Sequence, residues 1–369
     1  MTRRSRRLGQ RPQGSPSPLR LRRYSRRPRN RNAASCADTL IHAIASQAAV
    51  VRPVVAIVGA GRVGCALGRR LREKGWRIGP VITRSMRTAR AARRRIGTGQ
   101  PQAGLSDAVL AADLILIATP DRAIAETAET LARILPARRS AAQGDDKDNR
   151  SGSARQTRGP RKSGGKAWRG KIALHTSGAL GSDVLRPLAL RGAAIGSLHP
   201  LQTFSGRNTP SLAGCACAIE GSTAALPMAR RICRELGGVP VVLPQRRKAA
   251  YHAAAALAAG HVLAVIEAAV HILVTVGFPR KRAVRALLPL TRQTLANYER
   301  LGARAAWTGP LNRGDFSVIE RHLEALRRFP REYREAYDAL SRLGVNVLAN
   351  GSSSKKRQLE QALTRISTD

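Results

Sequence analysis

Aromatic and acidic side chains are scarce in this sequence. Phe, Trp and Tyr together make up 3% of its 369 residues, too few for a protein that stacks nucleobases on aromatic side chains. Asp and Glu number 23 against 65 Lys and Arg, which leaves a formal net charge of +42. Such an excess is typical of proteins that bind nucleic-acid phosphates, but a basic surface without a specific partner has it too. The hydrophobic content of 43% excludes a chain that is disordered throughout.

The positive charge is unevenly distributed. Residues 1–52 carry a net charge of +12 and residues 137–171 a net charge of +8, together nearly half of the total. From these compositions we expect a disordered basic tail at 1–52 and a disordered insertion at 137–170. A transit peptide and a start codon upstream of the true one are alternative interpretations of the tail. The 56 Arg against nine Lys indicate a GC-rich coding sequence, so we interpret the charge as background and expect no nucleic-acid partner.

The five cysteines lack the spacing of a metal site. Their odd number and the lack of a clear secretory signal predict free thiols in a reducing compartment, so we expect a cytoplasmic protein without a bound metal. Residues 249–276 form an apolar run of a length that suits a membrane span. Because His252, His261, Glu267 and His271 interrupt it, we expect a helix buried in a helical domain or a dimer interface, and no membrane partner.

Strand and helix patterns alternate through the first two thirds of the chain. Strands are predicted at residues 54–58, 78–83, 113–118, 171–174, 193–198, 215–219 and 239–243, and helices at 65–74, 84–96, 122–135 and 223–236. This alternation is typical of an α/β fold with a Rossmann-type doubly wound sheet. Helical patterns follow at 249–276, 280–301, 315–326 and 332–343. We therefore expect a Rossmann-like dinucleotide-binding domain at 53–244, an all-helical C-terminal domain at 245–345 and a polar tail at 346–369.

A glycine motif follows the first predicted strand. Gly59-Ala60-Gly61-Arg62-Val63-Gly64 has the spacing G-x-G-x-x-G and lies between a buried-strand pattern and a helix, the context that gives this motif its meaning. The first glycine permits a tight turn, the second lets the backbone approach a pyrophosphate, and the third lets helix and strand pack closely. The helix N-terminus attracts the phosphates. The alternative is a strand–helix turn without a ligand.

The residues after the second predicted strand bear on the choice between NADP and NAD. An NAD enzyme usually places Asp or Glu there, on the ribose hydroxyls. This chain has Arg84 and Ser85, with Arg87 and Arg90 behind them, and such groups pair with a 2′-phosphate. We predict NADP, with NAD possible; the alternative is that these Arg continue the general excess. Thr119 and Pro120, after the third strand, are predicted to lie beside the cofactor.

Two histidines come at the ends of predicted strands. His175 and Ser177 follow one strand and His199 follows the next, at the sheet edge where α/β proteins bind ligands. His252 lies near the start of the long apolar run, after Tyr251. We predict that these four residues, His175, Ser177, His199 and His252, line a substrate cleft, where imidazoles orient substrate or move protons. The alternative is that each His caps a loop through backbone hydrogen bonds.

A turn between the predicted C-terminal helices contains two further candidates. Asp315 fits a helix N-cap. Arg313 is placed to reach an anionic substrate group, and a structural turn explains it equally well.

Four segments in order resemble a known family. They are His175-Thr176-Ser177-Gly178-Ala179-Leu180, residues 196–204 (Gly-Ser-Leu-His-Pro-Leu-Gln-Thr-Phe), Tyr251-His252-Ala253-Ala254-Ala255, and Thr308-Gly309-Pro310 with Arg313-Gly314-Asp315. The chain resembles the bacterial Rossmann-like proteins that carry the domain of unknown function 2520. The wider resemblance is to pyrroline-5-carboxylate reductase and ketopantoate reductase.

The resemblance implies an NAD(P)-dependent oxidoreductase that transfers hydride to or from a small carbonyl, imine or hydroxy substrate. It also implies a homodimer formed through the helical domain. Two departures stand out: Gly260 occupies the place where the family usually has Asn, and the catalytic Lys of the related reductases has no secure counterpart, which leaves His252 as our candidate proton donor. The alternative functions are a non-catalytic dinucleotide-binding regulator and a basic protein that associates with nucleic acid.

Overall fold

The computed structural model describes residues 52–134, 167–349 and 353–368. The predicted tail, except Arg52, and most of the predicted insertion lie outside these ranges. The last four residues of that insertion, 167–170, form a turn in which Trp168 is fully buried. The expected disorder therefore does not extend to residue 170, because Trp168 packs into the hydrophobic core.

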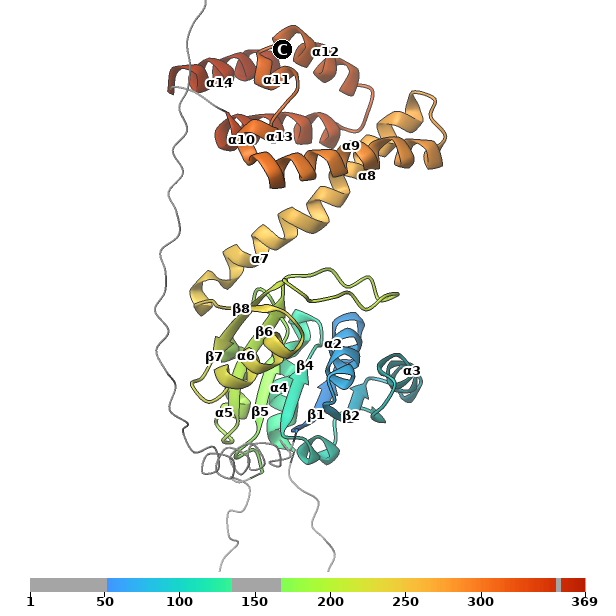
Figure 1. The fold of residues 1–369 in the computed structure, drawn as a ribbon, viewed down its shortest axis with the longest axis vertical. Coiled ribbons are helices and arrows are strands. Elements are labelled where there is room, and N and C mark those ends of the chain that lie inside the picture. The colour runs from blue at the N-terminus through green and yellow to red at the C-terminus, as the bar shows by residue number, and fades with distance from the viewer. Residues whose placement is uncertain (1–51, 135–166, 350–352, 369) are drawn as a thin grey trace, which may run out of the picture. The chain divides into compact units, whose positions relative to one another are not determined.

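One sheet of eight strands organises the first part of the described chain (Figure 1). Its strands are β1 (Val54–Val58), β2 (Arg77–Thr83), β3 (Gln100–Ala103), β4 (Leu114–Ile117), β5 (Ile172–His175), β6 (Ala194–Pro200), β7 (Ala216–Gly221) and β8 (Val239–Val242). The order across the sheet is β3-β2-β1-β4-β5-β6-β7-β8. All neighbouring pairs are parallel except β6 and β7, which are antiparallel. A loop rather than a crossover helix joins β6 to β7, and an antiparallel pair needs no crossover.

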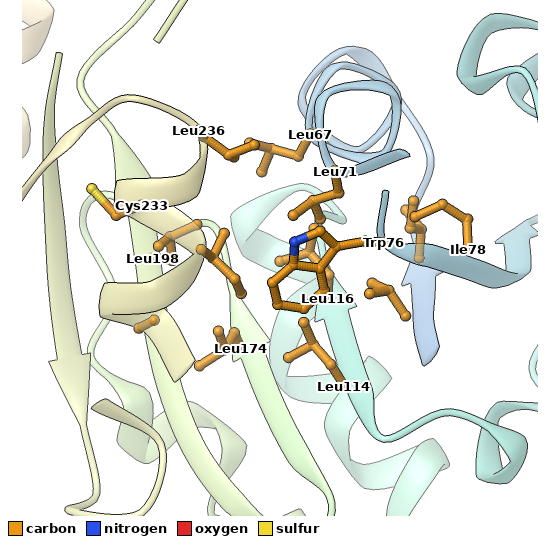
Figure 2. Packing of buried hydrophobic residues seen from close by; sticks show 14 of the residues in the cluster. Leu67, Leu71, Trp76, Ile78, Leu114, Leu116, Leu174, Leu198, Cys233 and Leu236 are labelled. Atoms are coloured by element: carbon orange, nitrogen blue, oxygen red, sulfur yellow. The ribbon is translucent and has the colours of Figure 1, made fainter. Parts of the chain in front are cut away.

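Helices cover both faces of this sheet. They are α2 (Arg62–Glu73), α3 (Met86–Ile96), α4 (Ile124–Arg133), α5 (Arg186–Ala189) and α6 (Leu226–Glu235), with short 3₁₀ turns at Asp107–Ala111, Asp121–Ala123, Ser182–Leu185 and Gln245–Arg247. Helices α2, α3 and α6 pack on one face, where Trp76 lies among Leu71, Leu114 and Leu116 (Figure 2). Helices α4 and α5 pack on the other face. The Rossmann-type doubly wound fold is thus confirmed.

The long apolar run is helical but not buried. It comprises α7 (Lys248–Ala256), a π-helical turn (Leu257–His261) and α8 (Val262–Thr275). Within α7 and α8, Lys248 and Val270 are the buried residues, so burial inside a helical domain of one chain was a wrong expectation. By length and composition alone, the helical stretch Gln245–Thr275 is the one candidate membrane span among the described residues.

Further helices complete the described chain. They are α9 (Arg280–Leu301), α10 (Ala303–Ala306), α11 (Pro310–Arg313), α12 (Phe316–Leu326), α13 (Arg331–Leu348) and α14 (Ser353–Thr368). The C-terminal region is all-helical, as predicted. The prediction of a polar tail at 346–369 needs correction. Residues 346–348 complete α13, and α14 buries Leu359 and Leu363 against Ile319 and Val345. Asp315 precedes α12, yet its side chain makes no capping hydrogen bond.

Candidate functional site

The glycine loop has the geometry that its sequence predicts. Gly59 has a φ of +81°, and a Cβ there would lie 2.6 Å from the Thr119 nitrogen, so only glycine fits this turn. A Cβ on Gly64 would lie 2.8 Å from the Gly59 oxygen and 3.2 Å from Ile57 Cγ2, which shows how closely α2 packs on β1. Gly61 is different, because a Cβ there would meet no atom nearer than 4.0 Å. Its position is therefore open to a ligand that approaches the backbone.

The side chains around this loop differ in whether they already have hydrogen-bond partners. Ser85 caps α3, since its Oγ accepts from the Thr88 nitrogen at 3.3 Å. Arg84 is exposed, and its side chain has no hydrogen bond or ion pair within the described ranges. Thr119 Oγ1 is buried and lacks a hydrogen-bond partner. Among the described residues, this pattern leaves the Arg84 guanidinium available for a ligand and the Thr119 hydroxyl without a partner beside the glycine loop.

His175 is held in a single tautomer by backbone atoms. It ends β5 and is fully buried; its Nε2 donates to the Gly181 oxygen at 3.0 Å, and its Nδ1 accepts from the Ser177 nitrogen at 3.2 Å. Burial first, and then the positive charge of Lys248, lower its pKa to about 4. Both ring nitrogens are thus engaged in shaping the loop that follows β5.

Ser177 joins that loop to the turn after β4. Its Oγ donates to Asp121 Oδ2 at 2.7 Å and accepts from the nitrogens of Ala179 and Leu180. The hydroxyl is therefore fully occupied. Of the four predicted cleft residues, Ser177 and His175 hold the loop, while His199 and His252 retain nitrogen atoms for other partners.

His199, Tyr251 and His252 form a cluster between β6 and α7. The His199 Nδ1 and the Tyr251 hydroxyl are 3.0 Å apart, and the rings of His199 and His252 lie edge to face with centroids 5.5 Å apart. Burial is the main cause that lowers the pKa of His199 to about 4, followed by the charges of His252 and Lys248. Burial also raises the pKa of Tyr251 to about 12. The phenol is therefore protonated and His199 is neutral at physiological pH.

The two imidazoles pack against Gly178, where there is no room for a side chain. A Cβ on this residue would lie 2.5 Å from His252 Nδ1 and 2.9 Å from His199 Nε2. His252 Nδ1 is buried and has no hydrogen-bond partner. Buried polar atoms are nearly always paired in folded proteins, so this atom is a candidate for binding a ligand.

Lys248 is a residue of the site that sequence reasoning missed. Its side chain is 1% exposed, and its Nζ donates to the Ser197 Oγ at 2.7 Å and to the Ser177 oxygen at 3.1 Å. Burial lowers its pKa to about 8, although Glu220 and Asp121 oppose this shift. In the sequence, Lys248 directly follows Arg246 and Arg247, and three consecutive basic residues indicate a cluster exposed to solvent. The spacing of four between Lys248 and His252 was the available signal, since such residues share a helix face.

The predicted turn residues Arg313 and Asp315 contact each other instead of this cluster. Arg313 Nε lies 2.8 Å from Asp315 Oδ2, and both side chains are exposed. The ion pair also explains why the carboxylate does not cap α12.

Comparisons with known proteins agree with this architecture. Residues 42–143 match the model of a Rossmann-like domain, and residues 215–343 match the model of the domain of unknown function 2520. A candidate NADP oxidoreductase from Bacteroides fragilis is 21% identical with a TM-score of 0.59, covering 79% of this chain and 97% of its own. No curated protein matches the chain.

Two further solved structures share the fold. A reductive aminase from Aspergillus terreus, in complex with NADPH and ethyl-5-oxohexanoate, is 16% identical with a TM-score of 0.55, covering 83% of this chain and 98% of its own. An imine reductase from Myxococcus stipitatus, in complex with NADP+, is 18% identical with a TM-score of 0.51, covering 80% of this chain and 94% of its own. At these identities the likeness shows the fold. The family models likewise match two separate parts of the chain, a Rossmann-like domain followed by the domain of unknown function 2520.

Proposed function

We propose that the protein is an NADP-dependent oxidoreductase that transfers hydride to or from a small carbonyl, imine or hydroxy substrate. One observation carries this proposal. Three buried side-chain polar atoms lack partners in the described ranges, and two of them, Thr119 Oγ1 and His252 Nδ1, lie at the carboxyl ends of the strands. Thr119 adjoins the glycine loop and His252 adjoins Gly178. A dinucleotide and a substrate at that edge would supply the missing partners.

The residues around the glycine loop fit such a cofactor. The open approach at Gly61 and the N-terminus of α2 suit the pyrophosphate. Arg84 has its guanidinium free to bind a 2′-phosphate, whereas the hydroxyl of Ser85 already caps α3. Thr119 would donate its orphaned hydroxyl to the cofactor. When bound, NADPH supplies the hydride.

The imidazole cluster suits the polar end of the substrate. Tyr251 donates from its protonated phenol to His199 Nδ1, which places the remaining ring proton on His199 Nε2. That Nε2 and His252 Nδ1 both lie against Gly178. There they hydrogen-bond the oxygen or nitrogen of the double bond being reduced, and His252 is our candidate to deliver its proton.

A second copy of the chain is the partner that we propose for the helical region. Large apolar side chains are exposed on α8 and α9, among them Leu263, Val265, Leu290 and Leu295. Contiguous exposed apolar surface commonly marks an interface. Sedimentation of the whole protein should show a dimer that Leu263→Glu dissociates, and a monomeric wild type would contradict this proposal. We propose no membrane or nucleic-acid partner and a cytoplasmic location.

A non-catalytic dinucleotide-binding regulator is the second candidate. It is favoured by the states of two residues: His199 is neutral at physiological pH and the Lys248 ammonium is buried, so neither is a ready acid. The test is to saturate the protein with NADPH and follow nicotinamide absorbance across a panel of small oxo acids and imines. Oxidation of NADPH that His252→Ala slows supports the oxidoreductase. Tight binding without turnover across the panel supports the regulator.

A further inference from the structure

The buried ammonium of Lys248 requires a compensating charge. Its side chain is almost completely excluded from water, and burying an unpaired charge is costly. Its two hydrogen-bond acceptors, the Ser197 hydroxyl and the Ser177 carbonyl, are both neutral. The compensation must therefore come from a group beyond these first partners.

Glu220 is the group that the sheet places behind Ser197. It lies on β7, directly opposite Ser197 of β6 in the antiparallel pair. Its Oε2 accepts from the Ser182 nitrogen at 2.8 Å and from Ser197 Oγ at 3.2 Å, and its Oε1 accepts from Ser182 Oγ at 2.6 Å. Three donors around two oxygens are the hydrogen-bonding pattern of an ionised carboxylate.

The direction of the hydrogen bonds that join Lys248, Ser197 and Glu220 is fixed. An ammonium can only donate, so Ser197 Oγ accepts from Lys248 Nζ. The single hydroxyl proton of Ser197 is then directed to Glu220 Oε2. The result is a continuous chain from ammonium through hydroxyl to carboxylate, enclosed by β6, β7 and the start of α7.

We propose that Glu220, acting through Ser197, is a positioning residue that holds Lys248 in its charged form inside the fold. We further propose that this fixed charge adds to the effect of burial in keeping the imidazoles of His175 and His199 neutral. The relevance of this charge to hydride transfer rests on the proposed function, because a neutral His199 hydrogen-bonds the substrate only if the protein is an oxidoreductase. The hydrogen-bonded series Lys248–Ser197–Glu220 itself is a property of the fold.

The groups that face these residues determine the sign of the effects. Lys248 faces Glu220 and Asp121, and both raise its pKa against the effect of burial. His199 faces His252, Lys248 and Asp121, while His175 faces Lys248, Asp121 and Asp183. Removing the Glu220 charge must therefore lower the pKa of Lys248 below about 8. Removing the Lys248 charge must raise the pKa values of both histidines above about 4.

The test is an NMR titration of the full chain, labelled at lysine and histidine side chains. Substitutions Lys248→Met, His175→Gln and His199→Gln assign the resonances by their loss. Glu220→Gln should lower the Lys248 midpoint by about one pH unit or more, and Lys248→Met should raise the His199 midpoint by a similar amount. The control Glu126→Gln removes an exposed carboxylate from α4 of the same domain and should leave both midpoints unchanged.

Two further variants keep the test decisive if Glu220→Gln fails to fold. Ser197→Ala removes the hydroxyl that links Lys248 to Glu220 but retains the carboxylate. It should lower the Lys248 midpoint by less than Glu220→Gln would. Glu220→Asp restores the charge, so the Lys248 midpoint should return toward that of the wild type. A structural role limited to the Ser182 turn would leave the Lys248 midpoint unmoved in every variant, and that result would overturn the proposal.

The proposal and the proposed function fail in different ways. The titrations need neither cofactor nor substrate, so shifted midpoints in a protein that does not bind NADPH would uphold the chain of charges and reject the oxidoreductase. Unshifted midpoints in a protein that oxidises NADPH would do the reverse.

Discussion

Acid should destabilise the sheet domain through His175 in particular. The ring is fully buried, and its Nδ1 already accepts from the Ser177 nitrogen. A proton on Nδ1 would face that N–H and place a second positive charge near Lys248. The unfolded chain has no such obstacle, so it binds a proton near the usual pKa of 6.5, whereas the folded chain does so at about 4. Stability is therefore complete above the unfolded pKa and is lost as pH falls toward the folded one.

The size of this effect follows from the two pKa values. The full difference amounts to about 3 kcal/mol of unfolding free energy, and about 2 kcal/mol of it is lost between about pH 7 and about pH 4.5. Lys248 does not contribute in this window, because it is protonated in both states. His199 contributes in the same direction, so a comparison with a variant is needed to isolate His175.

Urea unfolding followed by fluorescence provides the assay, since Trp76 and Trp168 are buried. His175→Gln keeps a donor for the Gly181 oxygen but cannot titrate. The variant should be less stable near pH 7, by about 1–3 kcal/mol, and its stability should fall by about 2 kcal/mol less than that of the wild type on acidification. Equal acid sensitivity in wild type and variant would refute the reasoning.

The other predictions concern the ligand side of the site. Gly178→Ala should displace the His199 and His252 rings, because its Cβ would lie within 3 Å of both; we expect turnover to fall about tenfold or more with little change in unfolding free energy. Unchanged kinetics would show that the rings do not act there. Arg84→Ala should weaken NADPH binding by about tenfold to a hundredfold and leave NADH binding unchanged. Arg94→Ala, on the exposed side of α3, is the matched control, and equal losses for both nucleotides would argue against a 2′-phosphate contact.

The sequence predicts the centre of the sheet better than its edges. Continuous apolar runs made β1 and β4 clear, because strands buried on both faces need them. Strand β3 was missed because its sequence, Gln-Pro-Gln-Ala, is polar and partly exposed at the sheet edge. Helix α14 was missed because its few apolar residues, Leu359 and Leu363 among them, gain their burial from distant helices. Tertiary packing decided both cases.

The candidate site was predicted only in part for a similar reason. His199 and His252 were chosen from their places after a strand and on a helix, and the structure brings them together. Lys248 was missed because Lys is rarely buried, and Glu220 was missed because its neighbours in the sequence do not indicate its hydrogen-bond partners. The contact of Glu220 with Ser197 depends on the antiparallel pairing of β6 with β7, which the sequence pattern does not reveal.

Titration of the purified protein with NADPH tests the central claim most directly. The comparison is with Gly61→Ala, whose Cβ meets no atom of the protein nearer than 4.0 Å but occupies the approach of a pyrophosphate to the backbone. The account predicts saturable NADPH binding that is tighter than NADH binding. It also predicts that Gly61→Ala weakens NADPH binding by about tenfold or more at an unchanged melting temperature. No saturable binding, or equal affinity in the wild type and Gly61→Ala, would contradict it.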